Sequence, residues 1–331
     1  MSFKDIPGNE RTKQILKLSL SKGRLPGSLL FFGPSGSGKL RTALTVAKAL
    51  NCLEKKDDSC DRCDSCLRVE RGQHPNVRLV VREKNREQIV KEQIEEINYL
   101  SNLRPWNQGR MVFIIDEADR MNETVANSLL KTLEEPGPFV HFILITEDLQ
   151  MILPTIRSRC QVLRFNPLSQ EHVEKALLER GLPPEKARLL AAASEGDLEA
   201  VLEADWEEFI AGRNQAWVMF RQLLEKGDSE DFLSLLSGRT RKDSVSDFRE
   251  ALKFFAVFFR DLLAVHEGQN GYLLNPDLEP ELIKLAAVIP PATASRAVRK
   301  MEDSRSLLKR NPNLAIMGNE LILFFREIRN G

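Results

Sequence analysis

The stretch GPSGSGKL, residues 33–40, constrains the fold of this chain more than any other part of its sequence. It matches the phosphate-binding pattern G-x-x-x-x-G-K-[ST] at every position except the last. The apolar run SLLFFG (28–33) precedes the loop, and KLRTALTVAKAL (39–50) continues it with helical spacing. A strand, a glycine-rich loop and a helix in this order predict the phosphate-binding turn of an α/β protein.

The residue types of this loop suit a nucleotide phosphate group. Backbone N–H groups around Gly33, Gly36 and Gly38, together with the ammonium of Lys39, would surround phosphate oxygens at the start of a helix. Leu40, however, stands where the pattern has a hydroxyl that holds Mg²⁺, and phosphoryl transfer without metal loses its main charge stabiliser. We therefore predict a degenerate nucleotide site. The plainer interpretation is a glycine-rich turn that binds no ligand.

Two further apolar segments predict buried strands. RMVFIIDEADRM (110–121) ends its apolar run in Asp116 and Glu117, and VHFILIT (140–146) follows after the helical pattern NETVANSLLKTLEE (122–135). Strands that alternate with helices favour a parallel sheet covered on both faces. In P-loop ATPases an Asp in this place holds Mg²⁺ through water and the Glu orients the attacking water. The alternative interpretation of the two carboxylates is a solvated strand end.

Four of the five cysteines, Cys52, Cys60, Cys63 and Cys66, are spaced C-x₇-C-x₂-C-x₂-C. Two adjacent C-x₂-C steps allow several thiolates to converge on one tetrahedral Zn²⁺. Because four thiolates would fill all the ligand positions, the predicted zinc site is structural. Disulfides are the alternative, and they are rare in a reducing cytosol.

The fifth cysteine ends the segment TIRSRC (155–160), which follows the strand pattern 140–146 after a turn that contains proline. Composition alone favours a local salt bridge as the role of Arg159 in this segment.

A chain of 331 residues suggests two or three domains. After about residue 165 the strand pattern disappears, short helical segments follow, and long amphipathic patterns dominate from Trp206 onward. We expect an α/β domain over residues 1–165 with a zinc insert at about 50–72, a small helical domain over 166–205, and a helical domain over 206–331.

Charge and hydropathy place few limits on partners. Residues 1–165 hold 26 basic and 21 acidic residues, a balance of +5, and the remainder holds 22 and 27, a balance of −5. A modest positive balance permits contact with nucleic acid. The apolar run FFAVFF (254–259) is far short of a membrane span, and no charged-then-apolar leader opens the chain. We expect a cytoplasmic protein with no membrane partner.

Taken together, these segments resemble the bacterial clamp-loader branch of the AAA+ ATPases over nearly the whole chain. The resemblance rests on the cysteine-rich insert followed by GQHPNV (72–77), the acidic strand end that runs into NSLLKTLEEP (127–136), the Ser-Arg-Cys motif at 158–160, and NPNLAIMGNELIL near the C-terminus. It implies an α/β AAA+ P-loop domain with a zinc-binding insert, followed by a small helical lid domain and an all-α C-terminal collar domain.

The family contains motor subunits that hydrolyse ATP and a non-motor subunit that does not, or does so poorly. Leu40 favours the non-motor (stator) role. So does Glu199, which stands in GDLEAVL (196–202) where motors carry a sensor-2 Arg, because a carboxylate repels a triphosphate. Lys39 and the carboxylates at 116 and 117 favour the alternative, an ATP-hydrolysing motor subunit. A P-loop kinase, the third interpretation, has no use for the Ser-Arg-Cys motif, the insert or the collar.

The resemblance also implies roles for other residues and for partners. Arg159 looks like the arginine finger inserted into a neighbouring subunit's ATP site, with Ser158 and Cys160 positioning it, and Thr146 matches the sensor-1 position. The implied cofactor is structural zinc, and the degenerate site would bind ATP or ADP without hydrolysis if it binds them at all. The implied partners are the clamp-loader motor subunits, a delta-type subunit, the sliding clamp and primer-template DNA at the replication fork.

Overall fold

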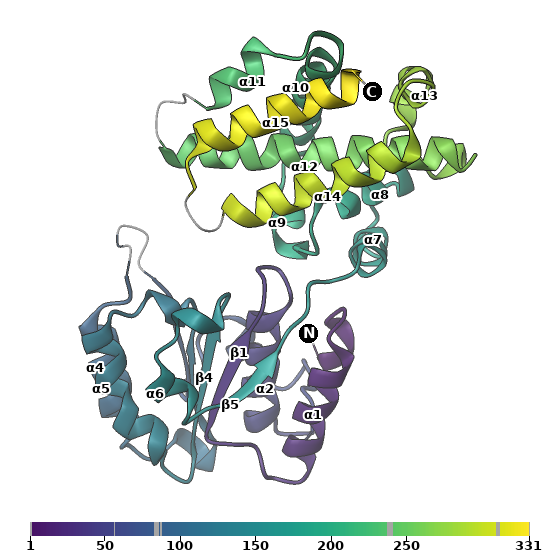
Figure 1. Ribbon diagram of the computed structural model, residues 1–331. Coiled ribbons are helices and arrows are strands. Elements are labelled where there is room, and N and C mark those ends of the chain that lie inside the picture. The colour runs from purple at the N-terminus through teal and green to yellow at the C-terminus, as the bar shows by residue number, and fades with distance from the viewer. Residues whose placement is uncertain are drawn as a thin grey trace. The chain divides into compact units, whose positions relative to one another are not determined.

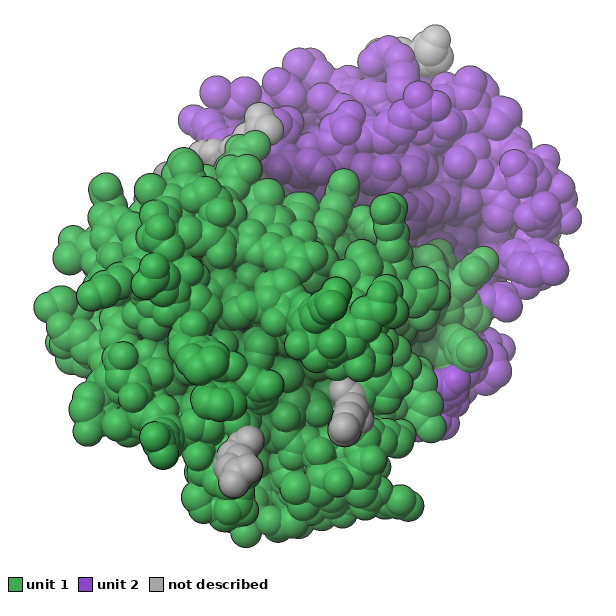
Figure 2. Space-filling model, turned by 90° about the horizontal axis from the view of Figure 1, so that it is seen from below, with its two compact units in different colours: residues 1–176, 195–199 green, residues 177–194, 200–331 purple. Residues whose placement is uncertain are grey.

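Residues 2–55, 57–82, 86, 88–236, 241–308 and 312–330 are described by a computed structural model of the chain (Figure 1). The chain forms two compact units, which Figure 2 distinguishes by colour. Unit 1 comprises residues 1–176 and 195–199, and unit 2 comprises residues 177–194 and 200–331. The segment expected as a lid, 166–205, is thus divided between the units, and its status as a separate domain stays a prediction.

Unit 1 is built on a parallel sheet with the strand order β2-β3-β4-β1-β5. The strands are β1 (Ser28–Phe32), β2 (Val77–Val80), β3 (Met111–Ile115), β4 (Val140–Thr146) and β5 (Gln161–Arg164). The three strands predicted from apolar runs, β1, β3 and β4, are the central ones, where both faces are covered and the side chains are almost all buried. The edge strands β2 and β5 expose half or more of their residues, and their sequences carry no such run.

Helices cover both faces of this sheet (Figure 1). The helices around the sheet are α1 (Glu10–Ser21), α2 (Lys39–Asn51), α3 (Asp64–Glu70), α4 (Lys91–Leu100), α5 (Glu123–Glu134) and α6 (Pro154–Arg157). Helix α7 (Gln170–Leu178) follows β5, does not cover the sheet, and has its last two residues in unit 2. Alternate residues of a strand point to opposite faces. In β3, Phe113 and Ile115 therefore pack toward α4, α5 and α6, whereas Val112 and Ile114 pack toward α1 and α2. The fold is the predicted parallel α/β architecture.

The order of the strands brings three predicted site segments together. β4 pairs with β1 on one side and with β3 on the other, with Phe32 opposite Thr146 and Ile115 opposite Leu144. In a parallel sheet all carboxyl ends meet at one edge. The loop after β1, the carboxylates after β3 and the end of β4 consequently lie next to one another there.

Unit 2 is helical. Its elements are α8 (Pro184–Ala193), α9 (Leu198–Glu203, whose first two residues belong to unit 1), α10 (Trp206–Lys226), α11 (Glu230–Leu235), α12 (Arg241–His266), α13 (Glu279–Ala286), α14 (Pro291–Leu308) and α15 (Leu314–Asn330). The run FFAVFF forms the middle of α12 and is fully buried, with Phe255 and Phe259 packed on Phe220 of α10 and Phe325 of α15. In the part of the chain that the structure describes, none of the helices has the length and hydropathy of a transmembrane span.

Candidate functional site

The loop between β1 and α2 has the backbone that its glycines predict. Gly33 has φ 153° and Gly36 has φ 63°, values that favour glycine. A Cβ atom on Gly33 would lie 2.2 Å from the carbonyl oxygen of Phe165, and one on Gly36 would lie 2.0 Å from Oδ1 of Asp197. The segment around Asp197 therefore lies directly against the phosphate loop.

Lys39, the lysine of the pattern, is directed back onto its own loop. Its side chain is buried, and Nζ donates to the carbonyl oxygens of Gly33 (2.7 Å) and Pro34 (2.6 Å). Burial lowers the pKa of Lys39, although the nearby carboxylates of Glu147 and Asp116 act in the opposite direction. The ammonium thus already has partners within the chain.

A pocket of about 330 Å³ lies at this edge of the sheet and brings together most of the predicted nucleotide-site residues. Its walls include five carboxylates and two cations, a balance of −3. The lining residues are Ser35, Gly36, Gly38, Lys39, Leu40, Asp116, Glu117, Asp119, Arg120, Ile145, Thr146, Glu147 and Glu199. Two of these carboxylates, Glu117 and Glu199, pair with Arg82 and Arg41, so the pocket is less acidic than its lining residues alone suggest.

The two carboxylates after β3 are arranged differently from each other. Asp116 accepts a hydrogen bond from the N–H of Glu117 at 3.0 Å, and burial raises the pKa of Asp116. Glu117 adopts a left-handed backbone conformation, with φ 49°, and its side chain pairs with Arg82 at 3.0 Å. One carboxylate therefore lies in the pocket wall with its charged form disfavoured, and the other is engaged by an arginine.

Thr146, at the end of β4, is fully buried and uses its hydroxyl within the chain. Its Oγ1 donates to Oδ1 of Asp119 at 2.7 Å. Asp119 was not singled out from the sequence, although it is the last acidic residue of the segment DEAD (116–119).

Leu40 and Glu199 complete the departure from a competent ATP site. Leu40 offers no oxygen ligand and packs against the core on the α1 and α2 side of the sheet. Glu199 pairs with Nε of Arg41 at 3.0 Å. The sequence did not indicate this partner, because the two residues are 158 positions apart. Together with the internally bonded Lys39, these contacts make the pocket a poor fit for Mg²⁺ and a triphosphate.

The four clustered cysteines converge as a metal site requires. Their Sγ atoms all lie within 4.8 Å of one another, and those of Cys60 and Cys66 are 4.0 Å apart. Four sulfurs at 2.3 Å from a tetrahedral zinc ion would be separated by ~3.8 Å. A disulfide needs about 2.05 Å, and all five cysteines are free thiols. The arrangement fits Zn²⁺ better than the disulfide alternative.

Two backbone N–H groups act on one of these thiols. Burial alone would raise the pKa of Cys60, but hydrogen bonds from the N–H groups of Arg62 and Cys63 lower it to about 7. The thiolate is the form that binds a metal ion. The loop backbone therefore favours the ligand form of Cys60.

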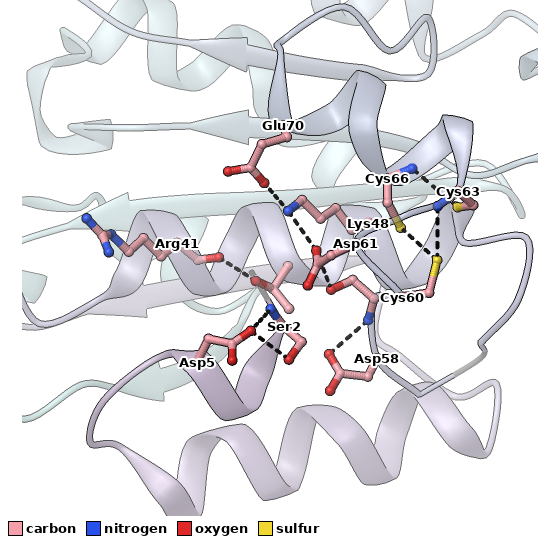
Figure 3. A network of polar contacts seen from close by, with 12 residues as sticks. Ser2, Asp5, Arg41, Lys48, Asp58, Cys60, Asp61, Cys63, Cys66 and Glu70 are labelled. Carbon is pink, nitrogen blue, oxygen red and sulfur yellow. Dashed lines mark hydrogen bonds and ion pairs between the residues drawn. The ribbon is translucent and has the colours of Figure 1, made fainter. Parts of the chain in front are cut away.

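Polar contacts attach this insert to the rest of unit 1 (Figure 3). The ammonium of Lys48, on α2, is buried and pairs with Asp61 at 3.0 Å and with Glu70. On the other side of the insert, Asp58 accepts a hydrogen bond from the N–H of Phe3 at 3.0 Å. None of these partners was predicted from the sequence. They lie within or next to the cysteine segment in sequence, but the cysteine spacing does not indicate which carboxylates pair with Lys48 or with the backbone of Phe3.

The Ser-Arg-Cys segment lies at the end of α6. Cys160 is buried in the core that α5 and α6 share, and burial raises the pKa of its thiol to about 12. The hydroxyl of Ser158 donates to the carbonyl oxygen of Thr155, and Nη1 of Arg159 donates to the same oxygen, each at 3.0 Å. The side chain of Arg159 is 30% exposed and pairs with Glu134 at 2.9 Å. The local salt bridge expected from composition is therefore present in this chain.

The five-stranded parallel sheet, the glycine-rich loop after β1 and the acidic residues after β3 are those of an AAA+ P-loop protein. Comparisons with known proteins narrow this class. A family model described as DNA polymerase III, delta subunit, matches residues 8–169, and a second, described as DNA polymerase III, delta subunit, C terminal, matches residues 209–326. The chain therefore belongs to the family of DNA polymerase III delta subunits.

Three individual proteins to which the chain is similar illustrate the range of the matches. DNA polymerase III subunit delta' of Bacillus subtilis is 31% identical over 99% of both chains. DNA polymerase III subunit tau of Escherichia coli is 31% identical over 65% of this chain and 34% of its own length. A solved structure of a DNA polymerase III gamma subunit-related protein from Thermotoga maritima is 16% identical, with a TM-score of 0.42 over 96% of this chain and 99% of its own.

Proposed function

We propose that this chain is the delta-prime-type, non-motor (stator) subunit of the bacterial replicative clamp loader. In this role it assembles with the ATPase motor subunits and a delta-type subunit in the cytoplasm, at replication forks. The complex loads the sliding clamp onto primer-template DNA, and Arg159 supplies an arginine finger to a neighbouring motor's ATP site. The similarity to the delta' subunit of Bacillus subtilis over nearly the whole length of both chains supports the assignment.

The observation that most supports the stator role is the ion pair between Glu199 and Arg41, which lies in the first turn of α2. In an ATP site the residue at this place would contact the γ-phosphate. Here a carboxylate stands there, and its charge is neutralised by a residue of the helix that follows the phosphate loop. With Leu40 in place of a metal-binding hydroxyl, the local site has lost both its Mg²⁺ ligand and its sensor. We therefore expect no hydrolysis at this site.

An ATP-hydrolysing motor subunit is the second candidate, and one observation favours it. Lys39, Asp116 and Glu117 remain in the pocket, although a site without function need not keep them. Membership of the DNA polymerase III delta subunit family excludes the kinase alternative. Nucleotide binding and turnover by the purified chain, measured alone and then with motor subunits added, separate the two remaining candidates. Motor-like turnover by the chain alone would favour the second.

The proposed role of Arg159 as an arginine finger is tested in a separate experiment. Arg159→Ala should leave folding and assembly nearly unchanged, because an exposed ion pair contributes only about 0–1 kcal/mol to stability. It should lower DNA-stimulated ATP turnover and clamp loading by the assembled complex. Arginine fingers of other enzymes contribute roughly 10³–10⁵-fold to kcat. The loss of total turnover here should be much smaller, because other motor sites keep their own neighbours. Unchanged turnover and loading at matched stoichiometry would leave Arg159 as a residue of a local salt bridge.

A further inference from the structure

The guanidinium of Arg159 is held by a carboxylate from a different helix. Glu134 is the last residue of α5, and its Oε2 accepts a hydrogen bond from Nε of Arg159 at 3.0 Å and lies 2.9 Å from Nη2. Nη1 donates to the carbonyl oxygen of Thr155. One edge of the guanidinium therefore faces Glu134, and the backbone of α6 fixes the group from a second direction.

These contacts use only some of the N–H donors of the Arg159 guanidinium. A guanidinium has five N–H donors in one plane. Nε and one N–H of Nη1 donate within the chain, and Nη2 lies 2.9 Å from the same carboxylate oxygen as an ion-pair contact. Among the described residues, one N–H on each Nη nitrogen has no acceptor. Two such donors on one planar group match two oxygens of a phosphoryl group.

Both partners of the pair are anchored to the same core. Leu129 and Leu133 of α5 are buried with Ile156 and Cys160, which flank Arg159 in sequence. Helix α5 ends at Glu134 because Pro136 follows two residues later and cannot continue it. The carboxylate is therefore presented at a fixed place beside the guanidinium, so the pair does not depend on a mobile loop.

We infer that Glu134 is a positioning residue for Arg159: it orients the guanidinium so that two N–H groups remain available to a phosphoryl group bound by another subunit. The inference rests on the proposed finger function. The Glu134 side chain is 57% exposed, so the pair contributes little to folding and its loss should act on turnover. An arginine that is already oriented loses less side-chain freedom when it docks on a phosphate.

The test compares Glu134→Gln with Glu135→Gln in the full chain assembled with its motor subunits. Glu135 is the adjacent exposed carboxylate, so the control removes the same charge without touching Arg159. The quantity measured is the part of DNA-stimulated ATP turnover that Arg159→Ala removes. We expect Glu134→Gln to lower this part by roughly 2- to 5-fold, the equilibrium factor of an exposed ion pair. The decrease should be in kcat, with KM for ATP unchanged, and Glu135→Gln should have no effect.

A double variant separates positioning from a general structural effect. In the Arg159→Ala background, Glu134→Gln should cause no further loss, and its thermal midpoint should equal that of Glu134→Gln alone. If Glu134→Gln raised ATP turnover, Glu134 would be holding Arg159 back from the phosphoryl group, and the inference would be wrong. Unchanged turnover in Glu134→Gln, with a clear loss in Arg159→Ala, would overturn the inference and keep the finger. No loss in Arg159→Ala would overturn both.

Discussion

Helix α2 has a candidate site at each end, and the two ends differ in how their polar groups are satisfied. At its start, Lys39 donates to carbonyl oxygens of its own loop, and Arg41 pairs with Glu199. Just beyond its other end, Cys52 joins three further thiols whose sulfurs face one another, with contacts no shorter than 3.3 Å from backbone N–H groups. At the first site the polar side chains already have partners within the chain, whereas the second site presents four converging ligand atoms.

This difference shows what a motif can and cannot establish. The letters of the phosphate loop predict the local backbone correctly, because glycine and helix geometry are local properties. Whether the loop binds a ligand depends on partners such as Glu199 that lie far away in the sequence. The cysteine spacing, by contrast, contains all four candidate ligands, so the sequence alone was enough to predict the group of thiols that the structure brings together.

Removing the metal should have the largest effect. We expect about one zinc ion per chain in the wild-type protein. Cys60→Ser should lose it, because metal binding organises the insert and its loss is a loss of folding free energy, here roughly 3–5 kcal/mol. The measurements are metal content and the thermal midpoint of the purified protein.

Cys160→Ser is the matched control for this experiment. It makes the same chemical change in the buried cysteine outside the cluster and should keep the zinc. If freshly reduced wild-type protein contained no zinc, the cysteine group would not be a metal site, and the proposed difference between the two ends of α2 would be wrong.

The attachment of the insert should matter less than its metal. Lys48→Met removes the buried ammonium that pairs with Asp61 and Glu70, and we expect a loss of about 1–2 kcal/mol, since both carboxylates keep access to water. Hydrogen exchange of residues 57–63 should become faster. Arg62→Met removes a cation of the same insert that is mainly exposed, and it should leave both quantities unchanged. Equal effects of the two variants would show that Lys48 is an ordinary surface charge.

At the other end of α2, one variant should increase stability. Burial raises the pKa of Asp116, so the folded state holds a proton more tightly than the unfolded state. The charged form is penalised at neutral pH, and the penalty is relieved as the pH falls through the raised pKa. Asp116→Asn should therefore stabilise the chain by on the order of 1 kcal/mol at pH 7.5. The gain over wild type, measured by urea unfolding, should shrink as the pH is lowered from 7.5 toward the ordinary aspartate value of 3.8.

Asp261 provides the contrasting case for Asp116→Asn. Burial also raises the pKa of Asp261, but this carboxylate accepts hydrogen bonds from the N–H groups of Leu274 and Asn275 and from Nδ2 of Asn275. The NH₂ group of an asparagine at this position would point at other hydrogen-bond donors. Asp261→Asn should therefore lower the free energy of unfolding by roughly 1–3 kcal/mol. If Asp116→Asn destabilised the chain to the same extent, the carboxylate would have a partner in the pocket beyond the N–H of Glu117, and the description of that end of α2 would be wrong.

The smallest effect is expected from restoring the missing hydroxyl. Leu40→Thr returns one Mg²⁺ ligand but leaves Glu199 paired with Arg41 and Lys39 bound to its own loop. The isolated variant should hydrolyse ATP no faster than the wild-type chain, whose turnover should itself be negligible. Phosphate release at saturating Mg²⁺ and ATP measures both. Motor-like rates of ATP hydrolysis in either protein would show that the internal contacts of Glu199 and Lys39 do not prevent catalysis at this site.

The sequence predicted the central strands β1, β3 and β4 because both faces of each are buried, which leaves unbroken apolar runs. It did not predict β2 or β5, which are four residues long with exposed positions at the sheet edges. Among site residues, it found those that belong to a local pattern. It missed Glu134 and Lys48, because their importance comes from pairing across elements, and no periodicity or spacing records such a pairing.

The position of β1 in the sheet has a consequence for synthesis of the chain. β1 ends at Phe32, but both of its neighbours come much later: β4 ends at Thr146 and β5 at Arg164. At about 5–20 residues per second, the ribosome needs roughly 6–23 s to extend the chain from 32 to 146. Throughout that interval the apolar segment SLLFF has no strand to pair with. The nascent chain is therefore most exposed to misassociation before β4 emerges, and chains that terminate early in this interval should depend most on chaperones.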